Sequence, residues 1–293
     1  MTHKAGFVNI IGNPNVGKST LMNVFVGEKI SIITSKSQTT RHRILGIVNG
    51  EDFQIVYSDT PGVIKPAYKL QESMLNFSKS ALADADILLY VTDIYEKIDK
   101  NETFLKMVKE SEVPVLLILN KIDQSNEEDL DALVDLWQKE FPKAEIIPTS
   151  ALKKFNTGNI FNRILELLPE SEAFYPKDQL TDKTERFFVE EIIREKILKF
   201  YKKEVPYATE IEVEEFKEDE KIIRMRAVIY VERQTQKGII IGHKGVAIKK
   251  VGVESRRDLE NFFDKQVHIE LYVKVKKNWR SLDEDLKKFG YQQ

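Results

Sequence analysis

A glycine-rich stretch near the N-terminus constrains this chain more than any other feature. Residues 12–19 read GNPNVGKS and match the P-loop pattern G-x-x-x-x-G-K-[ST]. The apolar run 6–11 before it predicts a buried strand, and residues 20–26 after it predict a helix. Main-chain N–H groups of such a loop face phosphate oxygens, and the helix N-terminus adds its dipole. The pattern therefore predicts a phosphate-binding loop between the first strand and the first helix of an α/β domain.

The P-loop pattern gives its defined positions separate roles. Gly12 and Gly17 let the main chain turn its N–H groups toward phosphate. The Lys18 ammonium reaches the β- and γ-phosphates, and the Ser19 hydroxyl ligates Mg²⁺. We predict that these residues bind nucleotide: Gly12, Asn13, Pro14, Asn15, Val16, Gly17, Lys18, Ser19 and Thr20. The loop alone leaves open which nucleotide binds and what its hydrolysis drives.

Length and composition narrow the class of protein. At 293 residues the chain is long for a single core, which predicts two domains. It contains no cysteine, so disulfides and thiolate metal sites are excluded. The longest apolar run, 113–119, is too short to span a bilayer, and the N-terminus lacks a signal-peptide pattern. We expect a cytoplasmic protein without a transmembrane segment, while peripheral membrane contact stays open.

The first part of the chain has the pattern of a nucleotide-binding sheet. From residue 6 to about 168, short apolar runs alternate with helical patterns, which is typical of a mostly parallel sheet with helices on both faces. Asn49-Gly50 between two of these runs indicates a hairpin, so we expect one antiparallel strand. Expected strands are 44–48, 53–57, 87–91, 115–119 and 146–147, and expected helices are 69–84, 100–111, 126–140 and 157–167. Ligands of such sheets bind at the carboxyl ends of the strands.

Two segments there suit metal and γ-phosphate binding. In Asp59-Thr60-Pro61-Gly62, the Asp59 carboxylate can hold Mg²⁺ through water, and the Gly62 N–H can meet a γ-phosphate. A threonine of the polar segment 37–41, which reads SQTTR, can add a hydroxyl to the metal. Taken alone, the first segment also fits an ordinary turn and the second an ordinary polar loop.

Two further segments suit recognition of a base. In Asn120-Lys121-Ile122-Asp123, the Asp123 carboxylate can accept hydrogen bonds from the N1–H and 2-amino groups of guanine. Adenine lacks that pair of donors and would leave a buried carboxylate unsatisfied. Asn120 can bond the other base edge, and the stem of Lys121 can cover the ring. The weaker signal Thr149-Ser150-Ala151 offers a main-chain N–H to the guanine carbonyl.

The order of these motifs resembles that of the translation-factor-related GTPases. The resemblance implies that Thr40 and Gly62 sense the γ-phosphate, and Thr40 is preferred to Thr39 because the threonine before arginine ligates the metal in relatives with a similar T-T-R segment. The metal set is then Ser19, Thr40 and Asp59. Beyond the P-loop, the predicted nucleotide-binding residues are Asp59, Thr60, Pro61, Gly62, Val63, Asn120, Lys121, Ile122, Asp123, Ser150 and Ala151.

One position departs from the best-known switches. Val63 follows Gly62, where Ras-like proteins carry a glutamine that orients the attacking water, and valine cannot do this. Relatives with a P-N-x-G-K-S loop use the asparagine to hold K⁺ beside the phosphates, so the resemblance suggests the same for Asn15. Arg41 is the alternative source of positive charge. The catalytic candidates are Lys18, Asn15, Thr40 and Gly62, and we expect slow intrinsic hydrolysis.

The second part of the chain has a different pattern. Pro169 and Pro176 flank a polar stretch, and we predict a linker at 171–183 between domains 1–170 and 184–293. A helix is expected from about 184, strands at 209–216 and 221–232 with a charged turn at 217–220, a helix reaching about 264, and a strand at 267–275. Gly242-His243-Lys244-Gly245 lies between two helical segments. The resulting order α-β-β-α-α-β resembles a type II KH domain, an α+β fold.

A G-x-x-G loop in a KH domain lets single-stranded RNA approach the main chain. Alone it is a common turn between helices, but residues 237–280 carry 11 Lys and Arg against 5 Asp and Glu in a chain of net charge −2. That asymmetry favours a polyanionic partner over a merely solvated charge run. The predicted RNA-binding residues are Lys237, Gly242, His243, Lys244, Gly245, Lys249 and Lys250.

Taken together, the two domains and their linker resemble the Era family of bacterial ribosome-assembly GTPases. The stretches 38–43, 179–182 and 191–196 carry the resemblance outside the common motifs. It implies GTP and GDP as ligands, binding to small-subunit (16S) ribosomal RNA near its 3′ end, assistance in 30S maturation, and partial association with the cytoplasmic face of the cell membrane.

Two other functions are compatible with parts of the sequence. The first is a GTPase regulator of cell division that acts at the membrane surface, with the basic domain bound to lipid headgroups. The second is a P-loop metabolic kinase, against which Asn120 and Asp123 argue because they suit guanine recognition.

Overall fold

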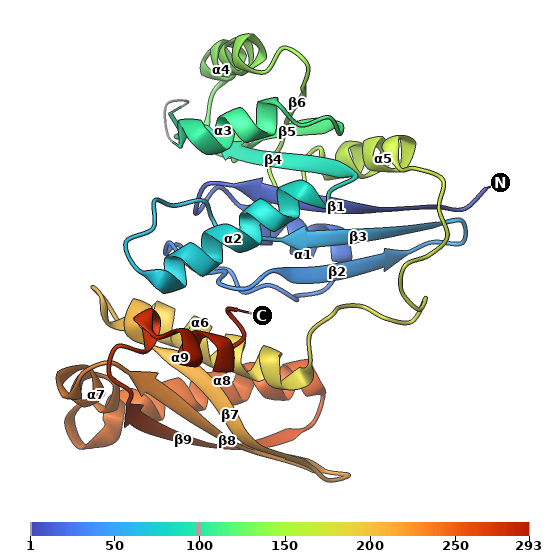
Figure 1. The fold of residues 1–293 in the computed structure, drawn as a ribbon. Coiled ribbons are helices and arrows are strands. Elements are labelled where there is room, and N and C mark those ends of the chain that lie inside the picture. Colours follow the sequence, from blue (N-terminus) through green and yellow to red (C-terminus); the bar gives the residue numbers. More distant parts are fainter. Residues whose placement is uncertain (1, 98–100, 293) are drawn as a thin grey trace. The chain divides into compact units, whose positions relative to one another are not determined.

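The computed structural model describes residues 2–97 and 101–292 and divides into two compact units (Figure 1). The first unit comprises the chain up to residue 67 together with 71–182. The second comprises 68–70 and the chain from residue 183 onward. Among the described residues, none of the helices is both long and apolar enough to cross a bilayer.

A mixed sheet forms the centre of the first unit. Within the described part of the chain its strands are β1 (Lys4–Gly12), β2 (Ile44–Asn49), β3 (Phe53–Asp59), β4 (Ile87–Asp93), β5 (Val115–Asn120) and β6 (Glu145–Pro148). Their order is β2-β3-β1-β4-β5-β6, and only the β2–β3 pair is antiparallel. The predicted mostly parallel sheet with one antiparallel strand is confirmed.

Helices cover this sheet at the predicted places. They are α1 (Lys18–Val26), α2 (Lys69–Ala83), α3 (Glu102–Lys109), α4 (Glu127–Glu140) and α5 (Thr157–Leu167). Side chains of α2, α3 and α4 share one hydrophobic cluster with β4 and β5. Strand and helix ends differ from the predicted ones by at most two residues. Residue 100, the first of the helix predicted at 100–111, lies outside the described residues.

The segment predicted as a linker covers the outer edge of β2. Thr181 forms an antiparallel bridge with Gly46, and the Ile47 N–H donates to the Leu180 carbonyl over 2.8 Å. The Thr181 hydroxyl also donates to the Leu45 carbonyl over 2.6 Å. Because of these bonds to β2, residues 171–182 belong structurally to the first unit.

The second unit has the predicted KH order of elements. It contains α6 (Glu185–Phe200), β7 (Glu210–Glu218), β8 (Ile222–Val231), α7 (Gln234–Ile241), α8 (Val246–Phe263) and β9 (Gln266–Val275). The sheet order is β7-β8-β9, with β7–β8 antiparallel and β8–β9 parallel. The type II KH prediction is confirmed. A short helix, α9 (Asp283–Lys288), follows and was not predicted.

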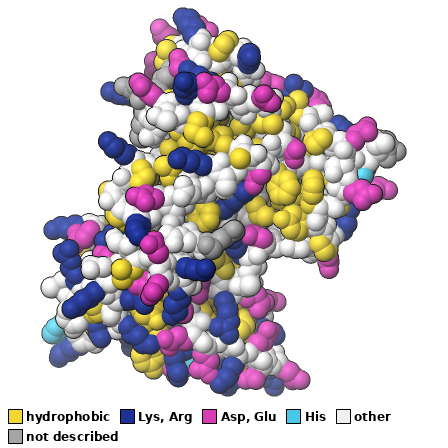
Figure 2. All heavy atoms as spheres, in the orientation of Figure 1, with side chains coloured by type: hydrophobic (Ala, Val, Ile, Leu, Met, Phe, Trp, Pro, Cys, Tyr) yellow, Lys and Arg dark blue, Asp and Glu magenta, His cyan; other side chains and the backbone are white. Residues whose placement is uncertain are grey.

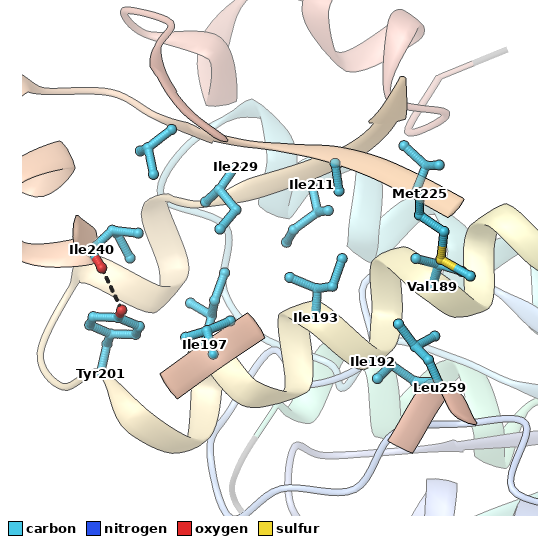
Figure 3. Packing of buried hydrophobic residues seen from close by; sticks show 14 of the residues in the cluster. Val189, Ile192, Ile193, Ile197, Tyr201, Ile211, Met225, Ile229, Ile240 and Leu259 are labelled. Atoms are coloured by element: carbon cyan, nitrogen blue, oxygen red, sulfur yellow. Dashed lines mark hydrogen bonds between the residues drawn. The ribbon is translucent and has the colours of Figure 1, made fainter. Parts of the chain in front are cut away.

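Helix α6 packs its apolar side against this sheet. Figure 3 shows Ile193 and Ile197 of α6 facing Ile211 of β7 and Ile229 of β8. The Tyr201 hydroxyl just after α6 donates to the Ile240 carbonyl of α7 over 2.6 Å. Along β8 the buried and exposed side chains alternate at first, as predicted for a strand with one solvated face. Ile240 of α7 and Val251 and Leu259 of α8 belong to the same buried cluster, so packing in this core positions the two helices and the loop between them.

Candidate nucleotide site and RNA interface

The P-loop connects β1 to α1 and buries its lysine. The Lys18 ammonium donates to the carbonyls of Gly12 over 3.1 Å and Asn13 over 2.7 Å. Burial lowers the pKa of Lys18 to about 8, although the charges of Asp59 and Glu96 oppose that shift. Both bonds go to the loop's own main chain, so the ammonium is held inside the loop where phosphate oxygens can replace the carbonyls.

Gly17 is required by a close approach to the base-reading motif. It has φ +105, and a Cβ atom there would lie 2.1 Å from Nδ2 of Asn120. Asn120 is buried, donates to the Val16 carbonyl over 2.8 Å and accepts from the Ala151 N–H over 3.0 Å. One amide side chain therefore ties together three motifs that are distant in the sequence.

Three oxygen-bearing side chains predicted as metal ligands meet beside the P-loop. The Ser19 hydroxyl donates to Oδ2 of Asp59 over 2.7 Å and lies 2.9 Å from the Thr40 hydroxyl, which is 3.2 Å from the same carboxylate oxygen. Thr39 turns elsewhere, because its hydroxyl bonds Thr34 and the Lys36 carbonyl. The arrangement favours Thr40 over Thr39, as the T-T-R resemblance implied.

The carboxylate of Asp59 suits a cation. Burial raises the pKa of Asp59, against the Lys18 charge and the hydroxyl hydrogen bonds that lower it. Its Oδ1 atom is buried and has no hydrogen-bond partner among the described residues. An unpaired buried carboxylate oxygen is costly, and Mg²⁺ prefers hard oxygen ligands. Within residues 2–97 and 101–292 no group of three acidic or imidazole side chains could hold a metal alone, so Mg²⁺ here would take further oxygen ligands from phosphate or water.

The guanine motif is also interlinked. Asp123 accepts a hydrogen bond from the Ser150 hydroxyl over 2.6 Å, and the Lys121 ammonium bonds the Asn15 carbonyl and Oδ2 of Asp93, each over 2.6 Å. Asp123 is exposed in the structure, so discrimination by a desolvated carboxylate requires that the base itself covers it. Asp93, at the end of β4, was missed, because the strand was predicted to end at 91 and no motif marks the position.

The D-x-x-G segment lies against the P-loop. A Cβ atom at Gly62 would come within 2.7 Å of the main chain of Pro14, so only glycine fits. The next side chain, Val63, is buried in the hydrophobic cluster that includes Tyr90 and Phe104. Its direction into the core adds a second reason, beside its chemistry, why residue 63 cannot orient a water at the phosphates.

A cavity of about 390 Å³ opens between the P-loop and the polar segment 32–40. Lys18, Ser19, Thr40 and Gly62 all line it. Asn15 stands at its rim, exposed and with φ 66, and its amide donates to the Ser35 carbonyl over 3.1 Å. The structure thus gathers the catalytic candidates around one space.

In the second unit, the G-x-x-G loop presents its central residues to solvent. Gly242 has φ +72, and a Cβ atom there would lie 2.6 Å from Cβ of Ala247, so the loop closes tightly on the start of α8. His243 and Lys244 are exposed. Lys249 is exposed as well, while the Lys250 ammonium lies 4.4 Å from the Phe200 ring centroid. Lys237 on α7 is half-buried.

A groove that the sequence did not reveal lies between α8 and β9. It encloses about 360 Å³, has an apolar floor that includes Val253 and Leu271, and is bordered by Lys249, Arg256 and His268. Apolar surface beside cations suits unstacked bases next to phosphates. Arg256 and His268 were not predicted, because the helical and strand patterns do not show which face of α8 lies next to β9. Figure 2 shows basic side chains on this unit standing among acidic ones.

Comparison with known proteins places the chain. Residues 7–121 match a family model described as a 50S ribosome-binding GTPase, and residues 204–280 match a KH domain. The chain is 42% identical over 290 residues to the GTPase Era of Clostridium kluyveri, covering 98% of this chain and 99% of that protein. The chain belongs to the Era family of GTPases. Era of Staphylococcus haemolyticus is 42% identical over 291 residues, with 99% and 97% covered.

Two solved Era structures share the whole architecture. One is Era in complex with MgGDPNP and nucleotides 1506–1542 of 16S ribosomal RNA, with a TM-score of 0.95 and 37% identity over 99% of this chain and 100% of that one. The other is a point variant of Aquifex aeolicus Era bound to GDP·AlF4⁻, with a TM-score of 0.94 and the same identity and coverage. The fold of both units is therefore that of Era.

Proposed function

We propose that this Era-family GTPase is a switch that uses GTP to control binding of small-subunit ribosomal RNA near its 3′ end, and that it assists 30S maturation in the cytoplasm. The observation that carries the proposal is the likeness, over both units, to an Era that holds MgGDPNP and 16S nucleotides 1506–1542. Residues 1–170 would handle the nucleotide and 184–293 the RNA, with 171–183 between them.

The nucleotide half of the proposal rests on the oxygen cluster and the buried ammonium. Ser19, Thr40 and Asp59 would hold Mg²⁺, and Lys18 would exchange its two carbonyl partners for phosphate oxygens. When bound, the metal would neutralise charge on the β- and γ-phosphates. Asn120 keeps one amide hydrogen beyond its bond to Val16, and Asp123 keeps one carboxylate oxygen beyond its bond to Ser150. Both remain available to a guanine edge.

Hydrolysis in this proposal proceeds without a side chain that orients water. Val63 is buried, and the Gly62 main chain already lies on the P-loop. Positive charge beside the phosphates would come from Lys18 and from K⁺ held at Asn15, which stands at the rim of the cavity. The Asn15 amide nitrogen bonds the Ser35 carbonyl, so its oxygen could hold the ion while the side chain keeps its contact with segment 32–40.

The RNA half of the proposal rests on the loop 242–245 and the groove beside it. The loop would bring phosphates to the main chain, while the groove between α8 and β9 would take bases. Because Gly62 and Thr40 would respond to the γ-phosphate, we expect RNA to bind the GTP form more tightly. By linkage, RNA would then tighten GTP binding by the same factor.

The test is a double variant, His243→Asp with Lys244→Asp. Both side chains are exposed, and Lys244 has φ 49, a backbone that Asp tolerates, so the variant should fold. The control is Lys217→Asp with Lys221→Asp, two exposed lysines near the β7–β8 turn whose replacement adds more negative charge than the loop variant does. We expect binding of an oligonucleotide of the 16S 3′ end to fall about 10-fold or more in the first variant only, given roughly 1–3 kcal/mol per charged contact.

Equal RNA binding by the two double variants would contradict the proposed interface. Equal RNA affinity with GDP and with a GTP analogue would contradict the proposed switch. If the protein binds anionic lipid vesicles without RNA, and the loop variant leaves that binding unchanged, the membrane regulator of cell division becomes the better account.

A further inference from the structure

The peptide that follows the D-x-x-G glycine is held on three sides. The Val63 N–H donates to the Gly12 carbonyl of the P-loop over 3.1 Å. The Val63 carbonyl accepts from Nδ2 of Asn101 over 3.1 Å, and the Val63 side chain is buried beside α3. Because the N–H, the carbonyl and the side chain of Val63 are all engaged, the neighbouring Gly62 N–H has little freedom to move. The position of that N–H decides whether a γ-phosphate is met.

Asn101 connects this peptide to the P-loop by a second route. The same amide group donates to Oδ1 of Asn13 over 2.5 Å, and Asn13 in turn donates to Oε2 of Glu96 over 3.0 Å. The Thr92 hydroxyl also donates to that Glu96 oxygen, over 3.3 Å. Every donor in this series meets an acceptor, so one assignment of the amide orientations satisfies the whole network.

The backbone at Asn101 suits this task. It has φ 63, in the left-handed region, and stands at the N-cap of α3 without a side-chain capping bond. The amide is therefore directed away from its own helix toward Val63 and Asn13. Phe104 and Leu105, one turn into α3, belong to the same hydrophobic cluster as Val63. Hydrogen bonds and apolar packing thus both connect Val63 to the first turn of α3.

We propose that Asn101 is a positioning residue, which holds the Gly62–Val63 segment against the P-loop so that the Gly62 N–H is preset for the γ-phosphate. Where other switches orient water with a glutamine at position 63, this chain uses position 63 as an anchor. The inference rests on the proposed role of Gly62 in sensing the γ-phosphate. Asn101 itself touches no nucleotide in this account.

The test compares two substitutions at Asn101 with one control. Asn101→Gly removes the amide without strain in the left-handed region, and Asn101→Asp keeps the size but cannot donate. The control is Asn278→Gly, the same change at an exposed left-handed asparagine of the second unit. Affinities for GDP and for a non-hydrolysable GTP analogue are measured in Mg²⁺, with kcat and KM for GTP and amide exchange at Val63.

We expect both Asn101 variants to lose about 3- to 10-fold in affinity for the GTP analogue, the effect of one or two hydrogen bonds. Affinity for GDP should change less than about 2-fold, because GDP has no γ-phosphate for Gly62 to meet. The Asn278 control should match the wild type in both, and the Val63 amide should exchange faster only in the Asn101 variants.

Three results would overturn the inference. Unchanged binding of both nucleotides, or equal weakening of both, would leave Asn101 with a structural role at most. Rapid exchange of the Val63 amide in the wild-type protein would do the same, and this measurement needs no variant to fold. Failure of the wild type to bind GDP would instead count against the proposed nucleotide site.

Discussion

The two candidate sites of this molecule are built in opposite ways. At the nucleotide site, side chains from distant motifs bond one another: Asn120 bonds Val16 and Ala151, and Ser19 bonds Asp59. At the KH groove, the structure offers a tight loop, an apolar floor and exposed cations. A site preset by its own hydrogen bonds should discriminate sharply between ligands, whereas a groove of exposed groups should bind by the sum of many small contacts.

The largest expected effect concerns guanine recognition. Asp123→Asn replaces an acceptor with a donor opposite the guanine N1–H and 2-amino group, so GTP affinity should fall on the order of 10²- to 10⁴-fold. Xanthine keeps the N1–H donor but carries a carbonyl acceptor in place of the 2-amino group, so xanthosine triphosphate should bind the variant better than the wild type does. Titration with both nucleotides checks this, with Asp131→Asn at an exposed position of α4 as the control. Parallel loss of both nucleotides would break the idea of sharp discrimination.

The next effect concerns the cation. The GTPase rate should be about 10-fold or more higher in K⁺ than in Na⁺, because a bound cation would replace part of the charge that an arginine finger supplies elsewhere. Asn15→Ala should abolish the difference while changing the rate in Na⁺ little. Steady-state phosphate release in the two salts at equal ionic strength decides the matter. Equal GTPase rates in K⁺ and Na⁺, with Asn15→Ala as active as the wild type in both salts, would contradict the proposal that Asn15 holds K⁺.

A smaller effect is expected in the groove. Arg256→Ala should weaken RNA binding about 3- to 10-fold, because Arg256 borders the groove and supplies one exposed charge. Arg257→Ala is a close control: Arg257 pairs with Glu254 as Arg256 pairs with Glu260, but it does not line the groove. Filter binding at several salt concentrations measures both. A loss as large as that of Asp123→Asn would mean that the groove, too, is built around single decisive contacts.

An effect of similar or smaller size is a pH dependence at the P-loop. With a pKa of about 8, the Lys18 ammonium loses its proton as pH rises through that value, and only the charged form attracts phosphate. GDP affinity should therefore fall about 4-fold between pH 7 and 8.5. Lys18→Arg keeps its charge over this range, so its affinity should stay flat. A wild-type affinity that does not change across the range would show that Lys18 remains charged at the site.

The difference between the sites also explains how well each could be predicted. The residues of the nucleotide motifs can be assigned a role from the local sequence alone. The lysine of G-x-x-x-x-G-K and the aspartate of N-K-x-D have few other uses. Arg256 and His268 are ordinary surface residues until a helix and an edge strand bring them together with Lys249, the only one of the three that was predicted to bind RNA. The G-x-x-G loop and the excess of Lys and Arg at 237–280 predicted an RNA-binding region, but neither indicated the groove itself.

Within the nucleotide site, the residues that were not predicted are those that make contacts between loops. Asp93 and Asn101 lie at the end of β4 and beyond it, outside every motif, yet one pairs with Lys121 and the other bonds Val63 and Asn13. The linker prediction treated 171–183 as separate from both domains, but the edge of β2 offers unpaired main-chain groups that Leu180 and Thr181 satisfy. An open strand edge of this kind has no signal in the covering segment itself.

The sequence alone determined the type of each unit, the order of its elements and the chemical groups offered to a nucleotide, because periodicity and side-chain chemistry are local properties. Tertiary structure decided that Thr40 rather than Thr39 meets Asp59, that Val63 turns into the core, and that Asn101 reaches two other loops. Those outcomes depend on which side chains meet when distant segments pack. Residues far away in the sequence set the position of each hydroxyl or amide, so a local sequence pattern cannot predict it.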